Sequence, residues 1–205
     1  MFKFKHVAVL LVISLMFSVL SCSGSYTFTI DGEYLVDSVN DRVYVVCSPS
    51  LRARSLATGR EYARVDRHMR LFVIGDRDDI LDPAEWLSED ISQGFAFVFR
   101  EKSVEEPTLR TFEPYAINVT ETEIATLHIF TIENLEHIEM FVNAILYGET
   151  VIGPAGRTHT HTLNFISKKY PWLQYVVQYV EYNGRGYLHD RGLGRWVEAP
   201  VIADE

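Results

Sequence analysis

The fold is decided by the stretch WLQYVVQYVEY, Trp172 to Tyr182, which is followed at once by Asn183-Gly184. Valine, tyrosine and tryptophan favour strands, and Asn-Gly between two apolar segments is the strongest short signal for a β-hairpin. Two further strand-like segments follow, Gly186 to His189 and Arg195 to Glu198. The last third of the chain therefore predicts neighbouring antiparallel strands.

One amphipathic helix is predicted from about Asn134 to Tyr147. Its apolar residues recur at three- and four-residue spacing, as on one face of a helix: Leu135, Ile138, Val142 and Ile145, with Phe141 and Leu146 widening the stripe. Asn134 suits the N-cap position and Gly148 suits the end. We expect this helix to cover one face of a sheet.

A second, short helix is predicted over about residues 82–90. Asp82 is a good N-cap residue, Pro83 suits the first helical position, and Glu85 stands three residues after Asp82 as a capping-box partner. Because strands precede, separate and follow the two predicted helices, the fold class is α+β, mainly antiparallel sheet. Residues 26–205 are expected to form a single domain, with a candidate seam at the charged, proline-containing segment 101–108.

The first residues have the pattern of a secretory signal. A basic start, Met1 to His6, precedes an apolar run from Val7 to Leu20, which is short for a membrane span. The run closes on Ser21-Cys22, and this ending resembles the lipobox of bacterial lipoproteins, although Leu20 is bulkier than usual at its position. The resemblance implies cleavage after residue 21, a lipid on Cys22, a tether at residues 22–25 and a membrane-anchored location outside the cytoplasm.

The charge balance argues against nucleic acid as a partner. Removal of residues 1–21 would leave 17 basic and 28 acidic residues, a net charge of −11 with neutral histidines. An acidic surface repels phosphate backbones. If Cys22 carries lipid, Cys47 is the single cysteine left, and its apolar neighbours indicate a small buried side chain.

His159 and His161 are the weak candidates for a metal site. In a strand they point to the same face, and two imidazoles can share one zinc ion. A catalytic zinc site needs a third protein ligand, for which His128, His137, His189 and Glu181 are candidates. The alternative is that both histidines lie at the margin of a core, on the face they share with Leu163 and Phe165.

An aromatic surface on the strand Trp172 to Tyr182 is the second candidate site. We expect a ligand surface that includes Trp172, Tyr175, Tyr179 and Tyr182, with composition suited to an envelope protein or a cell-wall glycan. The alternative is that these aromatic side chains are buried in a β core.

Arginines form a third feature. Eight lie between Arg42 and Arg77, and such density is typical either of a docking patch for carboxylate or phosphate groups or of a solvated face paired with nearby acids.

Known catalytic and nucleotide-binding motifs are absent: the sequence has no P-loop, no His-Glu-x-x-His and no Gly-x-Ser-x-Gly. The favoured interpretation is a lipid-anchored binding module without catalytic activity. A metal-dependent hydrolase centred on His159 and His161, and an inhibitor or immunity-type lipoprotein, are the alternatives.

Overall fold

The computed structural model describes residues 28–31, 33–54, 58–65, 69–75, 85–89, 97–122, 126–155 and 159–202. The predicted signal segment 1–21, Cys22 and the tether 22–25 lie outside these ranges. The described chain is mostly antiparallel β-sheet with two helices, so the predicted antiparallel sheet is confirmed and the fold is richer in strands than the α+β label implies.

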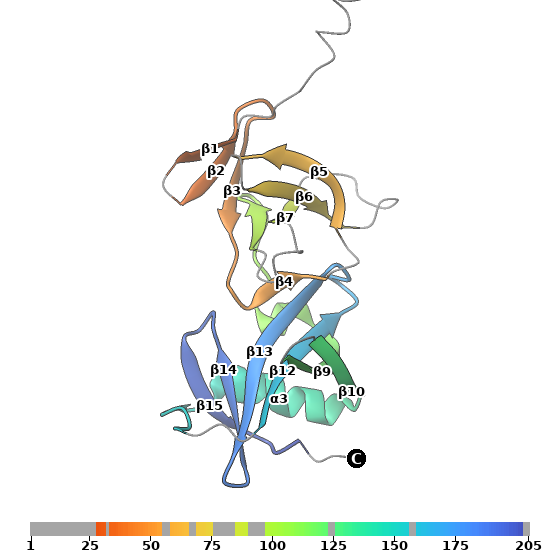
Figure 1. Cartoon of the computed structure of the whole chain (residues 1–205), viewed down its shortest axis with the longest axis vertical. Helices are drawn as coiled ribbons and strands as arrows, with labels where there is room; N and C mark the ends of the chain where they lie inside the picture. Colours follow the sequence, from red (N-terminus) through yellow and green to blue (C-terminus); the bar gives the residue numbers. More distant parts are fainter. Residues whose placement is uncertain are drawn as a thin grey trace, which may run out of the picture.

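Two sheets account for the strands (Figure 1). Sheet A has the order β1 (Phe28–Asp31), β2 (Tyr34–Asp37), β3 (Arg42–Val46), β8 (Val98–Glu101), β7 (Trp86–Glu89), β6 (Arg70–Ile74) and β5 (Thr58–Arg64). Sheet B has the order β10 (Thr126–Ile132), β9 (Pro114–Thr122), β12 (His159–Ser167), β13 (Leu173–Tyr182), β14 (Arg185–Asp190), β15 (Arg195–Ala199) and β11 (Thr150–Val151).

The predicted hairpin is present between β13 and β14. Asn183 and Gly184 both have positive φ, 53° and 71°, as a two-residue type I′ hairpin turn requires. The ladder pairs Tyr182 with Arg185 and runs on to the pair Gln178 and His189. The turn therefore fixes which residues of β13 and β14 share a face.

Strand β13 joins the two halves of the molecule. Its second half pairs with β14, whereas its first half pairs with β4 (Leu51–Ala53), a short strand that lies between β3 and β5 along the chain. Figure 1 shows β4 at the junction between the sheets. Residues from the N-terminal and C-terminal thirds of the chain therefore meet along one strand.

Helix α3 (Leu135–Tyr147) covers one face of sheet B and confirms the predicted helix. The Asn134 side chain accepts hydrogen bonds from the backbone N–H groups of Glu136 and His137, which caps the first turn. Ile138, Phe141 and Ile145 are buried against the sheet, while Leu135, 66% exposed, lies outside the buried stripe. In Figure 1 the helix crosses behind the strands of sheet B.

Residues 86–89 are the strand β7, so the short helix predicted over about 82–90 is wrong in this part; residues 82–84 lie outside the described chain. Trp86 packs into the large core that α3 shares with sheet B, and Leu87 packs into the separate core of sheet A. Burial on both sides of a central strand, between β6 and β8, outweighs the local capping signal.

Residues 102–108 connect the two sheets and lead into the short helix α2 (Leu109–Phe112). Thr108 and Thr111 form a capping box, and the helix buries Leu109 and Phe112. Phe112 stacks on Tyr170 with ring centroids 5.6 Å apart, and Tyr170 meets Trp86 of sheet A edge to face at 6.5 Å. One continuous core therefore contains side chains of both sheets.

A buried carboxylate holds the turn between β2 and β3. Asp37 accepts hydrogen bonds from the backbone N–H groups of Val39 and Asn40, from the Asn40 amide and from the Tyr62 hydroxyl. Burial alone would raise the pKa of Asp37, but these hydrogen bonds outweigh it and the net pKa is lowered. The carboxylate therefore stabilises the fold above its ordinary pKa, and this contribution disappears as the pH falls through the lowered value.

Within the described ranges, neither helix has the length and apolar content to span a bilayer.

Candidate functional site

The two candidate metal ligands belong to the start of β12, and the side chain of His161 lies on the side of sheet B that α3 covers. His161 is half-buried, stacks on Tyr179 with ring centroids 6.3 Å apart, and has a buried Nδ1 atom without a hydrogen-bond partner among the described residues. The ladder places Glu181, one of the candidate third ligands, opposite the backbone of His159. The side chain of His159 lies outside the described part of the structure, and the side chains within it contain no cluster of three or more metal-ligating residues.

The expected aromatic surface is wrong for two of its four members. Tyr175 and Tyr179 are 6% and 1% exposed, because α3 covers the face of β13 on which they lie. Tyr182 is half-buried on the opposite face, and Trp172 is half-buried against the large core. The opposite side of β13 carries the half-buried Gln174, Gln178 and Tyr182, because side chains alternate along a strand. Val176 and Val180 lie between them on the same side and are buried.

We call the side of sheet B away from α3 the open face. Cross-strand partners lie on the same face, so the ladders place five side chains in one row across five strands. This polar row runs in register through Thr120, Thr162, Gln178, His189 and Trp196. All five side chains are half-buried, so each is held by its neighbours while part of its surface meets solvent.

Hydrogen bonds order the open face beside the polar row. The Asn164 amide donates to the Asn118 carbonyl at 3.2 Å and to the Thr120 hydroxyl at 3.0 Å. Thr120 donates in turn to the Thr162 carbonyl at 3.3 Å. Thr131 on the edge strand β10 donates to the Asn118 side chain at 3.0 Å. The side chains of β9 and β12 are therefore fixed before any ligand arrives.

The other end of the polar row is aromatic. The rings of His189 and Trp196 stack with centroids 4.7 Å apart and an interplanar angle of 20°. Gly153 lies against the same indole, and a Cβ atom at this position would approach the Trp196 Nε1 to 2.6 Å. Glycine at position 153 is therefore what allows the chain to pass this close to the tryptophan.

A network of buried hydrogen bonds lies where β4 and the end of β14 come together beside β13. The Asp190 carboxylate accepts from the Ser50 and Tyr175 hydroxyls, both at 2.5 Å. It also accepts from the backbone N–H groups of Gly192 and Leu193 at 2.8 and 3.1 Å. Burial, followed by the charge of Asp190, raises the pKa of Tyr175, so this phenol stays protonated and remains a donor.

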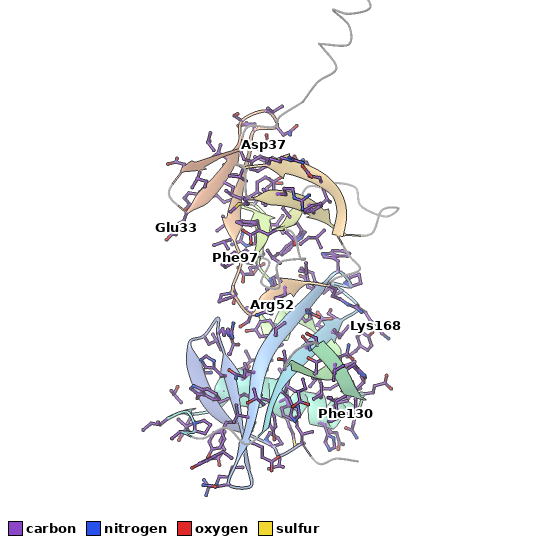
Figure 2. The ribbon with its side chains drawn as sticks, in the orientation of Figure 1. Glu33, Asp37, Arg52, Phe97, Phe130 and Lys168 are labelled. Carbon is purple, nitrogen blue, oxygen red and sulfur yellow. The ribbon has the colours of Figure 1, made fainter. Side chains whose placement is uncertain are left out.

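Two pockets lie near these features. One, of 430 Å³, is on the helix side of sheet B between the end of β10, the start of α3 and residues 200–202; Glu133, His137 and Phe141 are among its lining residues. The other, of 220 Å³, lies at the junction of the sheets and contains Arg52 and Arg191. Figure 2 shows Arg52 at this junction, with Phe97 near it.

Cys47 is not part of any of these sites. Its side chain is 5% exposed and belongs to the large core. Burial, with a further contribution from Glu106, raises the pKa of the thiol and keeps it protonated. This environment agrees with the small buried side chain that its apolar neighbours predict.

Comparison with models of protein families, with curated proteins and with solved structures found no match to this chain.

Sequence reasoning did not find the polar row or the arginine pair. His189, Trp196 and Thr120 belong to strands whose alignment with β13 is set by long-range pairing, which no local pattern shows. Alternation along residues 172–182 does separate the two faces of β13. Gln174 and Gln178 on one face were the available signal for the open side.

Proposed function

We propose that this chain is a non-catalytic binding module, held at a membrane surface outside the cytoplasm by a lipid on Cys22, and that it recognises a hydroxyl-rich glycan with the open face of sheet B. The polar row carries this proposal. It offers hydroxyl, amide, imidazole and indole groups, all half-buried, in one line across five strands.

The composition of the open face supports a glycan more than an apolar protein partner. The large apolar side chains that are exposed in the described chain, such as Leu127, Met140 and Ile152, lie outside the polar row. Protein-binding patches usually have apolar centres, whereas a sugar needs hydrogen-bond partners beside an aromatic ring. The stacked His189 and Trp196 provide that ring next to Gln178.

Binding can be tested with the full chain purified in detergent and with purified, insoluble peptidoglycan. We expect the protein to sediment with the glycan, and we expect Gln178→Ala and Trp196→Ala each to weaken binding at least about tenfold, or about 1.4 kcal/mol. Asn143→Ala is the matched control, since Asn143 is exposed on α3. Equal sedimentation of the parent and the two open-face variants, or no sedimentation of the parent, would contradict the proposal.

Anchoring can be tested separately, because the chain contains a second cysteine. Expression in a bacterium supplied with labelled palmitate should give an acylated protein, and Cys22→Ala should abolish the label. Cys47→Ala should retain it, because Cys47 is buried in the core. Label that persists in Cys22→Ala would refute a lipid on this residue, whatever the outcome of the glycan experiment.

A further inference from the structure

The pocket at the junction of the two sheets brings together three segments that are distant along the chain. The first segment is the connection from β3 to β4 with the start of β4, and it contributes Ser48, Pro49, Leu51 and Arg52. The second is the start of β8, with Phe97 and Val98, and the third is the turn between β14 and β15, with Arg191. Its volume of 220 Å³ is below the range of whole drug-sized ligands. The pocket therefore suits one end group of a ligand.

Two guanidinium groups line this pocket. Arg52 is half-buried and stands opposite Gln174 in the ladder between β4 and β13, where the open face borders β4. Arg191 is exposed in the turn that follows Asp190. Burial, followed by the charge of Arg191, lowers the pKa of Arg52, so the two guanidinium groups lie near each other. Two guanidinium groups that line one pocket offer several N–H donors to a single carboxylate.

The buried network fixes the segments that carry both arginines. Ser50, two residues before Arg52, donates to Asp190, which immediately precedes Arg191. The N–H group of Gly192, on the other side of Arg191, bonds both Ser50 and Asp190. A Cβ atom on Gly192 would overlap the Ser48 hydroxyl, so glycine allows this approach without movement of the serine side chain. The two backbones are thus held together before a ligand binds, which lowers the entropic cost of binding.

The remainder of the lining is largely apolar. Pro49, Leu51, Phe97 and Val98 surround the arginines, and the side chain of Phe97 is 52% exposed. The chain as a whole carries a net charge of −9, which repels multiply charged anions at long range. A singly charged carboxylate attached to an apolar group suits the apolar lining and is repelled less by the negative net charge than a phosphate is.

We propose that this pocket binds the terminal carboxylate and apolar side chain of a peptide, with Arg52 and Arg191 holding the carboxylate and Phe97 contacting the side chain. This site goes beyond the proposed glycan function, because Phe97 and Arg191 are not part of the open face. A small carboxylate can bind here whether or not the polar row binds a glycan, so the two proposals fail independently.

N-acetyl-L-leucine is a suitable probe, titrated into the full chain in detergent and followed by ligand-detected NMR. We expect saturable binding in the millimolar range. N-acetyl-L-leucinamide, which lacks the charge, and inorganic phosphate, which lacks the apolar group, should each bind at least about tenfold more weakly. Binding of the acid that does not saturate, or equal binding of the acid and either comparison compound, would overturn the proposal.

Variants assign the binding to the pocket. Arg52→Gln and Arg191→Gln should each weaken binding of the acid at least about tenfold, and Arg191→Lys should retain part of it, since lysine keeps the charge without the planar fork. Arg185→Gln is the matched control, because Arg185 is exposed and pairs with Glu198 on the surface. Thermal unfolding of each variant checks that it folds, and the exposed position of Arg191 keeps the test valid if Arg52→Gln does not fold. Undiminished binding by a folded Arg191→Gln would exclude this pocket.

Discussion

Replacement of Asp190 by alanine is expected to lower the free energy of unfolding by at least about 3 kcal/mol, because it removes one acceptor from four donors at once. Two of these donors are the Ser50 and Tyr175 hydroxyls, and both residues are buried. A buried donor without an acceptor loses its hydration and gains nothing in return. Asp190 as a whole residue is 3% exposed, so water would not easily replace its carboxylate.

Urea unfolding followed by circular dichroism measures this effect. Asp190→Asn should be intermediate, because the amide keeps one acceptor oxygen, and Tyr175→Phe should lower the stability by only about 1 kcal/mol. Asp31→Ala is the control, since Asp31 is exposed at the end of β1. If Asp190→Ala unfolded within about 0.5 kcal/mol of the parent, the network would not be holding β4 and β14 together.

Replacement of Phe112 by alanine is the second change with a large expected effect, about 3–5 kcal/mol for a fully buried phenylalanine. Phe112 is fully buried, and its ring stacks on Tyr170, which in turn meets Trp86 of β7. Loss of the ring opens a cavity at the contact between the two sheets. We therefore expect the sheets to unfold together in the parent and separately in the variant.

Coincidence of two probes tests this expectation. In the parent, tryptophan fluorescence and far-ultraviolet circular dichroism should give one urea midpoint. With Trp172→Phe and Trp196→Phe introduced into both proteins, Trp86 is the remaining tryptophan. In Phe112→Ala the two midpoints should then diverge, because Trp86 reports on sheet A while the dichroism reports on both sheets. Leu127→Ala, a change at an exposed position on β10, should leave the midpoints together. A single sharp transition in Phe112→Ala would mean that this contact does not couple the sheets.

The elements that were predictable from sequence are those in which local signals agree with long-range packing. Asn134 caps α3 and the three- and four-residue spacing buries Ile138, Phe141 and Ile145, so the helix is found with its boundaries. Asn183-Gly184 forms the hairpin because both residues tolerate positive φ. The same agreement is absent at residues 86–89, where a helix-start pattern precedes a strand that two cores bury.

The candidate sites were harder to predict because they depend on pairing across the whole chain. Which face of β13 remains open is decided by the position of α3, and this placement buries Tyr175 and Tyr179 while leaving Gln178 accessible. Arg52 meets Arg191 only because β4 docks on β13 beside β14. Alternation in sequence shows that two faces exist, but it does not show which one is covered.

The docking of β4 on β13 also bears on how fast this chain reaches its native state. Ser50 and Asp190 are separated by 140 residues, and Leu51 must find Tyr175 over a similar distance. The chain loses the entropy of closing such a long loop before the stabilising contacts form. Topologies of this kind therefore fold on the order of milliseconds to seconds, not microseconds. Until the last third of the chain arrives, β4 lacks its partner strand, and assembly of the junction must be among the latest folding events.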